Sequence, residues 1–320
     1  MNQRVIIVCM VIIYSVLLPS ASLAADLDLT VDLITGYRID NLDLGIAGDI
    51  NGYNPNVLSE LKWTDVEAYQ VGLGARALIL DHYCARASIS RALAYRGTCR
   101  DSDYTGDHRT GEYARSYADA DDSKFFDLSV GLGYQFRFFS NVLALTPMAG
   151  FSYSGQKLAM TNGVQTVDED GDEYDELGPL SGLDSTYEAK WSSWWAGIDL
   201  SVNPIRRLTI FGTIEYHYAD YTSDADWNLR EDLAHPTSFS DRANGEGVVI
   251  SGGIGYSFMD DWAAAVRVDY QEWWTDSGIA TAFGAFGGSS DTRLNRVNWD
   301  SLAIMLRLSY AIPAGKLRYP

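Results

Sequence analysis

Apolar and polar residues alternate along several stretches of this chain. Between Phe126 and Phe138 the even positions are Phe, Leu, Val, Leu, Tyr, Phe and Phe, whereas the odd positions are Asp, Ser, Gly, Gly, Gln and Arg. The same period of two recurs from Val248 to Phe258 and from Ser301 to Tyr310. Such a period indicates β-strands with one apolar and one polar face. An amphipathic sheet of this kind either spans a membrane or buries its apolar face in a soluble sandwich.

The polar faces and the connections distinguish these two folds. The polar faces are small and glycine-rich, as expected in a narrow lumen, rather than uniformly charged. Connections are short at 81–84, 139–141, 203–207 and 259–261 and long elsewhere. Short turns at one end and long loops at the other are typical of outer-membrane barrels.

We therefore predict an all-β fold, a ten-stranded antiparallel transmembrane β-barrel with long extracellular loops and short periplasmic turns. An even number of strands closes the sheet without an edge, as lipid requires. Several strands exceed the length of about 9–11 residues that crosses a bilayer, so we expect them to continue above the membrane as an extracellular rim. The expected strands cover residues 27–39, 57–80, 85–103, 123–138, 142–158, 188–202, 208–222, 246–258, 262–276 and 298–312.

The N-terminus predicts export. A basic residue, Arg4, precedes an apolar stretch from Val5 to Leu18, and the small residues of ASLAA follow. This is the pattern of a cleaved signal peptide, because the apolar run is short for a retained transmembrane anchor. We expect residues 1–25 to be removed and residues 26–320 to form one barrel in the outer membrane of a Gram-negative bacterium.

Composition and charge narrow the choice of partners. The chain holds 20 Tyr, 9 Trp and 29 Gly, as barrels with aromatic girdles and curved strands do. Its formal net charge is −19, which opposes binding to the phosphates of nucleic acid and favours a cationic partner. We expect outer-membrane lipid as a neighbour and cationic peptides or host and surface proteins as candidate partners.

The two cysteines that follow the expected signal peptide do not predict a disulfide, and the most acidic loop does not predict a metal site. Cys84 and Cys99 lie at opposite ends of the third expected strand, roughly 50 Å apart, which is too far for a disulfide. Asp168, Asp170 and Asp172 have the spacing of a calcium loop, but its glycine and final glutamate are missing. Solvated charge is the preferred interpretation, with weak calcium binding as the alternative, and no cofactor is predicted.

Asp101 and Asp103 are the first candidates for chemistry. Two carboxylates at i and i+2 of one strand point to the same side, where they can share a proton or orient a water. Unbroken alternation from the apolar odd positions, such as Leu93 and Tyr95, would turn both aspartates outward. A β-bulge is needed to turn them inward, and Gly97 is the expected place.

Four histidines are available as a base, and each is more often structural than catalytic. His82 is expected in a turn, His108 in the second loop and His217 beside Glu215 on a lumen face. His235 follows Asp232 in the fourth long loop.

Two short motifs resemble those of the omptins, a family of outer-membrane endopeptidases. Residues 59–63, SELKW, are similar to the family's S-x-L-x-W, and residues 97–104, GTCRDSDY, resemble its G-x-x-x-D-x-D-W. The resemblance implies that Asp101 and Asp103 form half of a catalytic site. It also implies an Asp-x-His dyad in the fourth long loop and possible dependence on lipopolysaccharide.

The dyad is where this sequence departs from the omptin pattern. No Asp-x-His occurs in the stretch from Tyr216 to Phe239, and an ungapped comparison places Asn228 and Arg230 at the dyad positions. A shifted loop would let Asp232 and His235 supply the two groups at another spacing.

Three functions follow, ranked by their fit to these residues. The first is an endopeptidase acting on cationic peptides, in which Asp101 and Asp103 hold a water that Asp232 and His235 activate. The alternative is a non-catalytic surface barrel, an adhesin or receptor, on the same scaffold. A channel ranks last, because inward side chains such as Arg267, Trp273 and Arg307 would leave little open bore.

Overall fold

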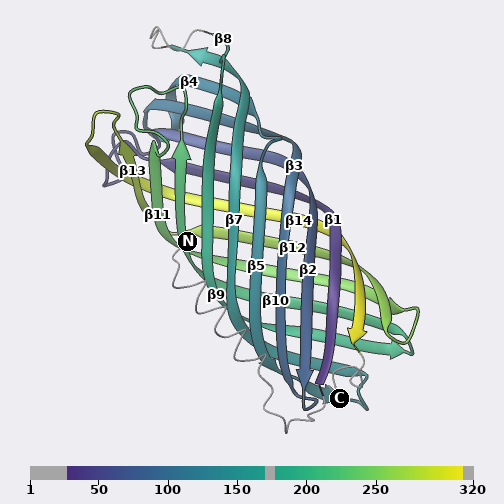
Figure 1. Ribbon diagram of the computed structural model, residues 1–320. Coiled ribbons are helices and arrows are strands. Elements are labelled where there is room, and N and C mark those ends of the chain that lie inside the picture. The colour runs from purple at the N-terminus through teal and green to yellow at the C-terminus, as the bar shows by residue number, and fades with distance from the viewer. Residues whose placement is uncertain (1–26, 170–176, 313–320) are drawn as a thin grey trace.

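The computed structural model describes residues 27–169 and 177–312, and Figure 1 shows them as a tall, tilted barrel. The expected signal peptide, and Asp170 and Asp172 of the calcium-like spacing, lie outside these ranges. In the part described, one 3-10 turn occurs, η1 (Asp107–Arg109), and no helix is long and apolar enough to cross a membrane.

The strands form a single antiparallel sheet that closes on itself. Over the described residues they are β1 (Leu27–Ile46), β2 (Ser59–Ile79), β3 (Tyr83–Gly106), β4 (Thr110–Asp119), β5 (Lys124–Tyr134), β6 (Phe136–Phe138), β7 (Leu143–Asp168), β8 (Gly178–Pro179), β9 (Asp184–Ile205), β10 (Leu208–Asp226), β11 (Phe239–Ser257), β12 (Trp262–Thr275), β13 (Gly278–Phe283) and β14 (Ser289–Ile312). The first and last strands pair from Leu29↔Ile312 to Ile46↔Leu294, so the ring has no open edge.

The ring has ten positions in the described residues, as the sequence predicted. The strands β4, β5 and β6 follow one another in the position between β3 and β7, and β12 and β13 share the position before β14. The short connections also lie where they were expected, around residues 80–82, 139–142, 206–207 and 258–261. We call this the short-turn end and the opposite one the long-loop end.

The strands extend further toward the long-loop end than predicted. β4 and β13 occupy stretches expected to be loop, and β7 and β14 gain about ten residues each over the predicted ranges. Alternation fails in these extensions because both faces are covered: Leu158, Ala159 and Met160 of β7 are all buried. A pattern with a period of two needs one solvent- or lipid-facing side, so it could not report these segments.

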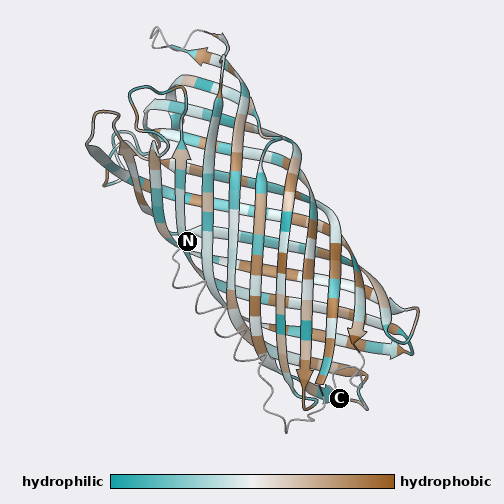
Figure 2. Cartoon of the chain, in the orientation of Figure 1, coloured by the Kyte–Doolittle hydropathy of each residue, from teal (hydrophilic) through white to brown (hydrophobic). Residues whose placement is uncertain are grey.

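The outer surface carries an apolar belt on the half nearer the short turns. Large apolar side chains are exposed there on every side of the ring, and Figure 2 shows brown segments along these parts of the strands. Aromatic pairs lie at both borders of the belt, with Tyr69 stacked on Tyr95 at 4.7 Å and Trp262 against Tyr310 at 4.8 Å. This is the arrangement of a barrel that crosses a bilayer, with girdles at the two interfaces.

The lumen is filled in its upper part by a cluster that we call the aromatic layer. Its members come from opposite walls and are all less than 2 % exposed: Trp63, Phe125, Tyr187, Trp191, Tyr221, Trp273 and Trp299. Trp63 of β2 lies 5.3 Å from Tyr187 of β9 across the barrel, and Trp273 and Trp299 stack at 5.6 Å. The wall glycines make room for these rings, since a Cβ on Gly247 would lie 2.6 Å from the Trp273 ring.

Candidate functional site

Asp101 and Asp103 face the inside of the barrel because β3 breaks its alternation below them. The β2–β3 register shifts between Thr64 and Ala68, opposite Gly97, whose φ of +156° is one that L side chains rarely adopt. Even positions such as Ala92 point inward before the shift, whereas the odd position Cys99 is buried in the core after it. The bulge predicted at Gly97 is therefore confirmed.

The two omptin-like motifs are neighbours in the sheet. Ser59 pairs with Asp103, Leu61 with Asp101 and Trp63 with Cys99. Directly opposite residues share a face of the sheet. The aspartates consequently stand above the buried Leu61 and Trp63, at the top edge of the core.

The Asp101 carboxylate is strongly perturbed. Its Oδ1 is shielded from solvent and accepts no hydrogen bond from the described residues. Burial, together with the charge of Asp103, raises the pKa of Asp101 well above its usual range. The Ser102 amide, the Ser59 hydroxyl and the positive charge of Arg230 oppose this shift. A carboxylate pair beside a cation is thus present at the rim.

Arg230 and Asp232 lie in the connection between β10 and β11, and they bind each other. The Arg230 guanidinium donates to both Asp232 oxygens, at 2.8 Å from Nε and 2.7 Å from NH2. This ion pair lowers the pKa of Asp232. The ungapped comparison with the omptin pattern placed Arg230 at a dyad position. In agreement with that placement, the charge of Arg230 acts on Asp101.

His235 does not pair with Asp232 as the re-spaced dyad required. Its Nδ1 lies 2.6 Å from Oδ1 of Asp226, at the end of β10, and this hydrogen bond raises the pKa of His235. Asp232 is engaged by Arg230 instead, because two residues of separation suit a bidentate contact. The structure thus brings Asp101 together with Asp103, and Arg230 near them, but it divides Asp232 and His235 between different partners.

Asn228, the other dyad position, has a structural role. Its Oδ1 accepts from the Asp184 amide and the Ser185 hydroxyl, both at 2.9 Å, and its Nδ2 donates to the Gly182 carbonyl at 2.8 Å. These bonds tie the β10–β11 connection to the turn before β9. The tie fixes the segment that carries Arg230.

The polar pair expected in the lumen is confirmed. His217 Nε2 lies 3.2 Å from Glu215, and its Nδ1 contacts Ser193 at 3.0 Å and Ser152 at 3.3 Å. Glu215 is also paired with Arg86. Cys84 and Cys99, the two cysteines in the described part of the chain, are both free, in agreement with the distance predicted between them.

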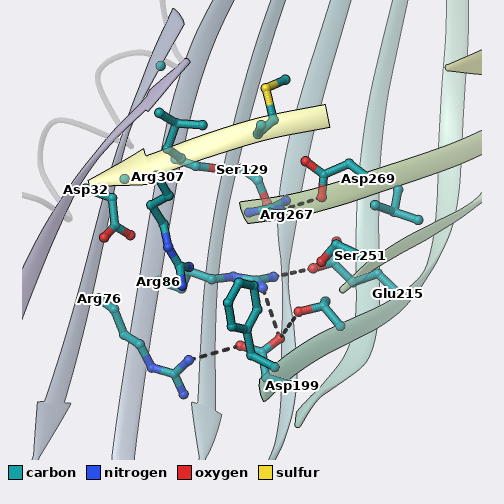
Figure 3. Close-up of a pocket in the computed structure, with 18 of the residues that line it drawn as sticks. Asp32, Arg76, Arg86, Ser129, Asp199, Glu215, Ser251, Arg267, Asp269 and Arg307 are labelled. Atoms are coloured by element: carbon teal, nitrogen blue, oxygen red, sulfur yellow. Dashed lines mark hydrogen bonds and ion pairs between the residues drawn. The ribbon is translucent and has the colours of Figure 1, made fainter. Parts of the chain in front are cut away.

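A cavity below the aromatic layer was not predicted. Its volume is about 720 Å³, and Figure 3 shows arginines and carboxylates projecting into it from the surrounding strands. From the sequence, inward side chains such as Arg267 and Arg307 were expected to leave little open bore, and a cavity among them was not anticipated. The sequence did contain a signal for this cavity, because small Ser, Thr and Gly residues on the lumen face leave space between the larger side chains. Six arginines line the same space: Arg38, Arg76, Arg86, Arg137, Arg267 and Arg307.

The carboxylates of the site do not gather around a metal-sized space. Over the ranges 27–169 and 177–312, no three His, Cys, Asp or Glu side chains are grouped as metal ligands. The carboxylates instead face guanidiniums, at the rim and in the cavity.

A family match and the structure of the protease OmpT agree with this architecture. The family described as "Pom: Protochlamydia outer membrane protein" matches residues 32–312. The outer membrane protease OmpT of Escherichia coli superposes with a TM-score of 0.74 at 13 % identity, covering 92 % of this chain and 100 % of that one. The translocator domain of the autotransporter NalP from Neisseria meningitidis gives a TM-score of 0.38 at 11 % identity, over 88 % of both chains. No curated protein matches in sequence.

Proposed function

The chain belongs to the Protochlamydia outer membrane protein family, and from this premise we propose a non-catalytic surface barrel that binds a cationic peptide at its long-loop end. The long loops face the exterior of the cell in this proposal, as they do in barrels of this class. The fold is that of an outer-membrane barrel resembling OmpT. The contacts of the residues at the rim distinguish a binding function from hydrolysis.

The observation that carries the proposal is that the cation whose charge acts on Asp101 is Arg230, which is itself ion-paired with Asp232. Water attack on a peptide needs a general base whose pKa lies near the working pH. A guanidinium stays protonated throughout the range of working pH, so Arg230 cannot accept that proton. His235 hydrogen-bonds Asp226, and Asp232 forms an ion pair with Arg230. The His235–Asp226 pair is an arrangement that can serve as a general base, but the cation whose charge acts on Asp101 is Arg230 and not His235. The charge of Arg230 at the aspartate pair is what favours binding over an endopeptidase.

Arg230 also indicates what the aspartate pair binds. Carboxylates match a guanidinium in charge and geometry. Arg230 is held by Asp232 in a bidentate ion pair, so it keeps a counter-ion when another cation approaches Asp101. An arginine of an incoming peptide could be that cation.

The test is binding and cleavage of one peptide by the refolded full chain. A fluorescent peptide containing Arg-Arg is titrated in detergent micelles, by anisotropy, and the recovered peptide is weighed by mass spectrometry. The wild type is compared with an Asp101→Asn/Asp103→Asn double variant. Asp122→Asn, an exposed aspartate between β4 and β5, is the matched control.

We expect the intact peptide to bind, with affinity falling at least tenfold in the double variant and remaining within twofold in the control. Arg230→Ala should bind more tightly than the wild type. Hydrolysis that the double variant abolishes would instead establish an endopeptidase. Equal binding by the wild type and the double variant would exclude the rim as the site.

A further inference from the structure

We propose that the lumenal cavity binds a small phosphate-bearing molecule through Arg307, whose guanidinium lies on the ring of Phe211. This site is separate from the rim and does not depend on the function proposed for it. The cavity volume of about 720 Å³ falls in the range of roughly 300–1,000 Å³ that small-molecule sites occupy.

Arg307 differs from the other arginines of the cavity in its partners. Arg38 pairs with Asp40 and Asp127, Arg86 with Asp199 and Glu215, and Arg267 with Asp269; Arg76 and Arg137 have a carboxylate at 3.5 and 3.6 Å. Within residues 27–169 and 177–312, Arg307 has no carboxylate within 4.0 Å. Its Nε is buried and has no hydrogen-bond partner among them.

An unpaired cation inside a barrel is costly. Burying a charge without a directly paired counter-ion is unfavourable. The charges of Asp32 and Asp269 attract the guanidinium of Arg307, whereas those of Arg267 and Arg76 repel it. An anion at this point would relieve both effects.

The nearest carboxylates are already engaged. Asp269 is paired with Arg267, and Asp32 accepts a hydrogen bond from Ser309 at 2.5 Å. Figure 3 shows Arg307, Arg86 and Arg76 reaching into the same space from the wall, with Asp199 bridging two of them. Several guanidiniums around one volume suit a phosphate, which carries more than one negative charge and several acceptor oxygens.

Phe211 holds the guanidinium of Arg307 in place. The guanidinium carbon lies 4.3 Å from the ring centroid, within the range of cation–π contacts. The ring in turn lies against Gly253, where a Cβ would come within 2.6 Å of it. The cation is therefore positioned by an aromatic surface and not by a carboxylate, which leaves its N–H groups available to a ligand.

The cavity extends toward the short-turn end of the barrel. Its lining includes Asn141 and Asn203, at the short-turn end, whereas the aromatic layer lies across the lumen on the other side. A ligand would enter from the short-turn side.

Isothermal titration calorimetry tests the proposal with inorganic phosphate as the probe. The refolded full chain is titrated in detergent micelles at pH 7, against sodium chloride of equal ionic strength. Arg307→Gln removes the charge, and Arg307→Lys keeps it without the planar fork. Arg206→Gln, an exposed arginine of the β9–β10 turn, is the control.

We expect at least tenfold weaker binding in Arg307→Gln, an intermediate loss in Arg307→Lys and a change below twofold in Arg206→Gln. If Arg307→Gln does not refold, two other measurements decide the question. They are phosphate binding by Arg307→Lys and the unfolding temperature of the wild type in phosphate and in chloride. Phosphate must raise the unfolding temperature of the wild type more than chloride does. An absence of phosphate binding by folded wild type, or equal binding by wild type and Arg307→Gln, would overturn the proposal.

Discussion

The two halves of the lumen are lined largely by the same strands, yet one is filled and the other is hollow. In the half toward the long loops, the inward residues are large rings such as Trp63, Trp191 and Trp299, which meet across the barrel. In the half toward the short turns, arginines and carboxylates share the lumen with serine, threonine and glycine. The volume of the rings fills the first half, whereas the small side chains among the ion pairs leave space in the second.

The boundary between the halves is a buried ion pair. Arg38 and Asp40 are each 2 % exposed, and the guanidinium donates to both Asp40 oxygens, at 2.7 and 2.6 Å. Trp299 of the aromatic layer donates to the same carboxylate at 2.9 Å. The comparison teaches that the charges at this boundary are held by several partners each, whereas Arg307 in the hollow half has no carboxylate within 4.0 Å among the described residues.

The largest expected effect comes from breaking this pair. Asp40→Ala leaves Arg38 buried with Asp127 as its remaining carboxylate, and the free energy of unfolding should fall by about 3–5 kcal/mol. Asp269→Ala, in the hollow half, removes a partner that is 22 % exposed and should cost less than about 1 kcal/mol. Urea unfolding of the refolded barrel in lipid vesicles measures both. Equal losses would mean that the cavity is as dry as the aromatic layer.

A smaller effect should separate two glycines on the same face of β11. Gly247→Ala places a Cβ 2.6 Å from the Trp273 ring and should destabilise the barrel by about 1–3 kcal/mol through overpacking. Gly255→Ala meets only ordinary contacts, the first being Ala265 at 3.5 Å, so its change should stay within about 1 kcal/mol of zero. The same unfolding experiment compares them. A comparable loss at Gly255 would contradict the hollow half.

Much of the fold could be predicted because alternation reports one specific physical situation, a strand with lipid on one side and the lumen on the other. That situation holds through the belt, and the ten positions, the short turns and the polar pair Glu215–His217 followed from it. It fails above the membrane, where residues such as Leu158 and Ala159 are buried on successive faces. The strands β4 and β13 were missed for this reason.

The candidate site was predictable in part. Asp101 and Asp103 could be placed because their spacing and Gly97 are local features of β3. The partners of Asp232 and His235 could not, since they depend on how a connection of twelve residues, 227–238, folds across the barrel. His235 bonds Asp226 and not Asp232 because of the tertiary structure of this connection. The spacing of the residues in the sequence does not predict that contact.

The smallest expected effect compares the rim carboxylates with each other. Burial raises the pKa of Asp101 in the folded state, so its ionisation opposes folding: the wild type should lose stability as pH rises above about 4, the unfolded value. Asp101→Asn removes this loss and should stabilise the barrel at pH 8 by about 1–2 kcal/mol, with little effect at pH 4.

For Asp232 the sign is reversed, because Arg230 lowers its pKa and the stabilising charge is lost as pH falls below about 4. Asp232→Asn should therefore destabilise the barrel at pH 8, by less than about 1 kcal/mol since the pair is exposed. Urea unfolding at both pH values checks the opposite signs, and a stabilising Asp232→Asn or a destabilising Asp101→Asn at pH 8 would contradict the rim electrostatics described above.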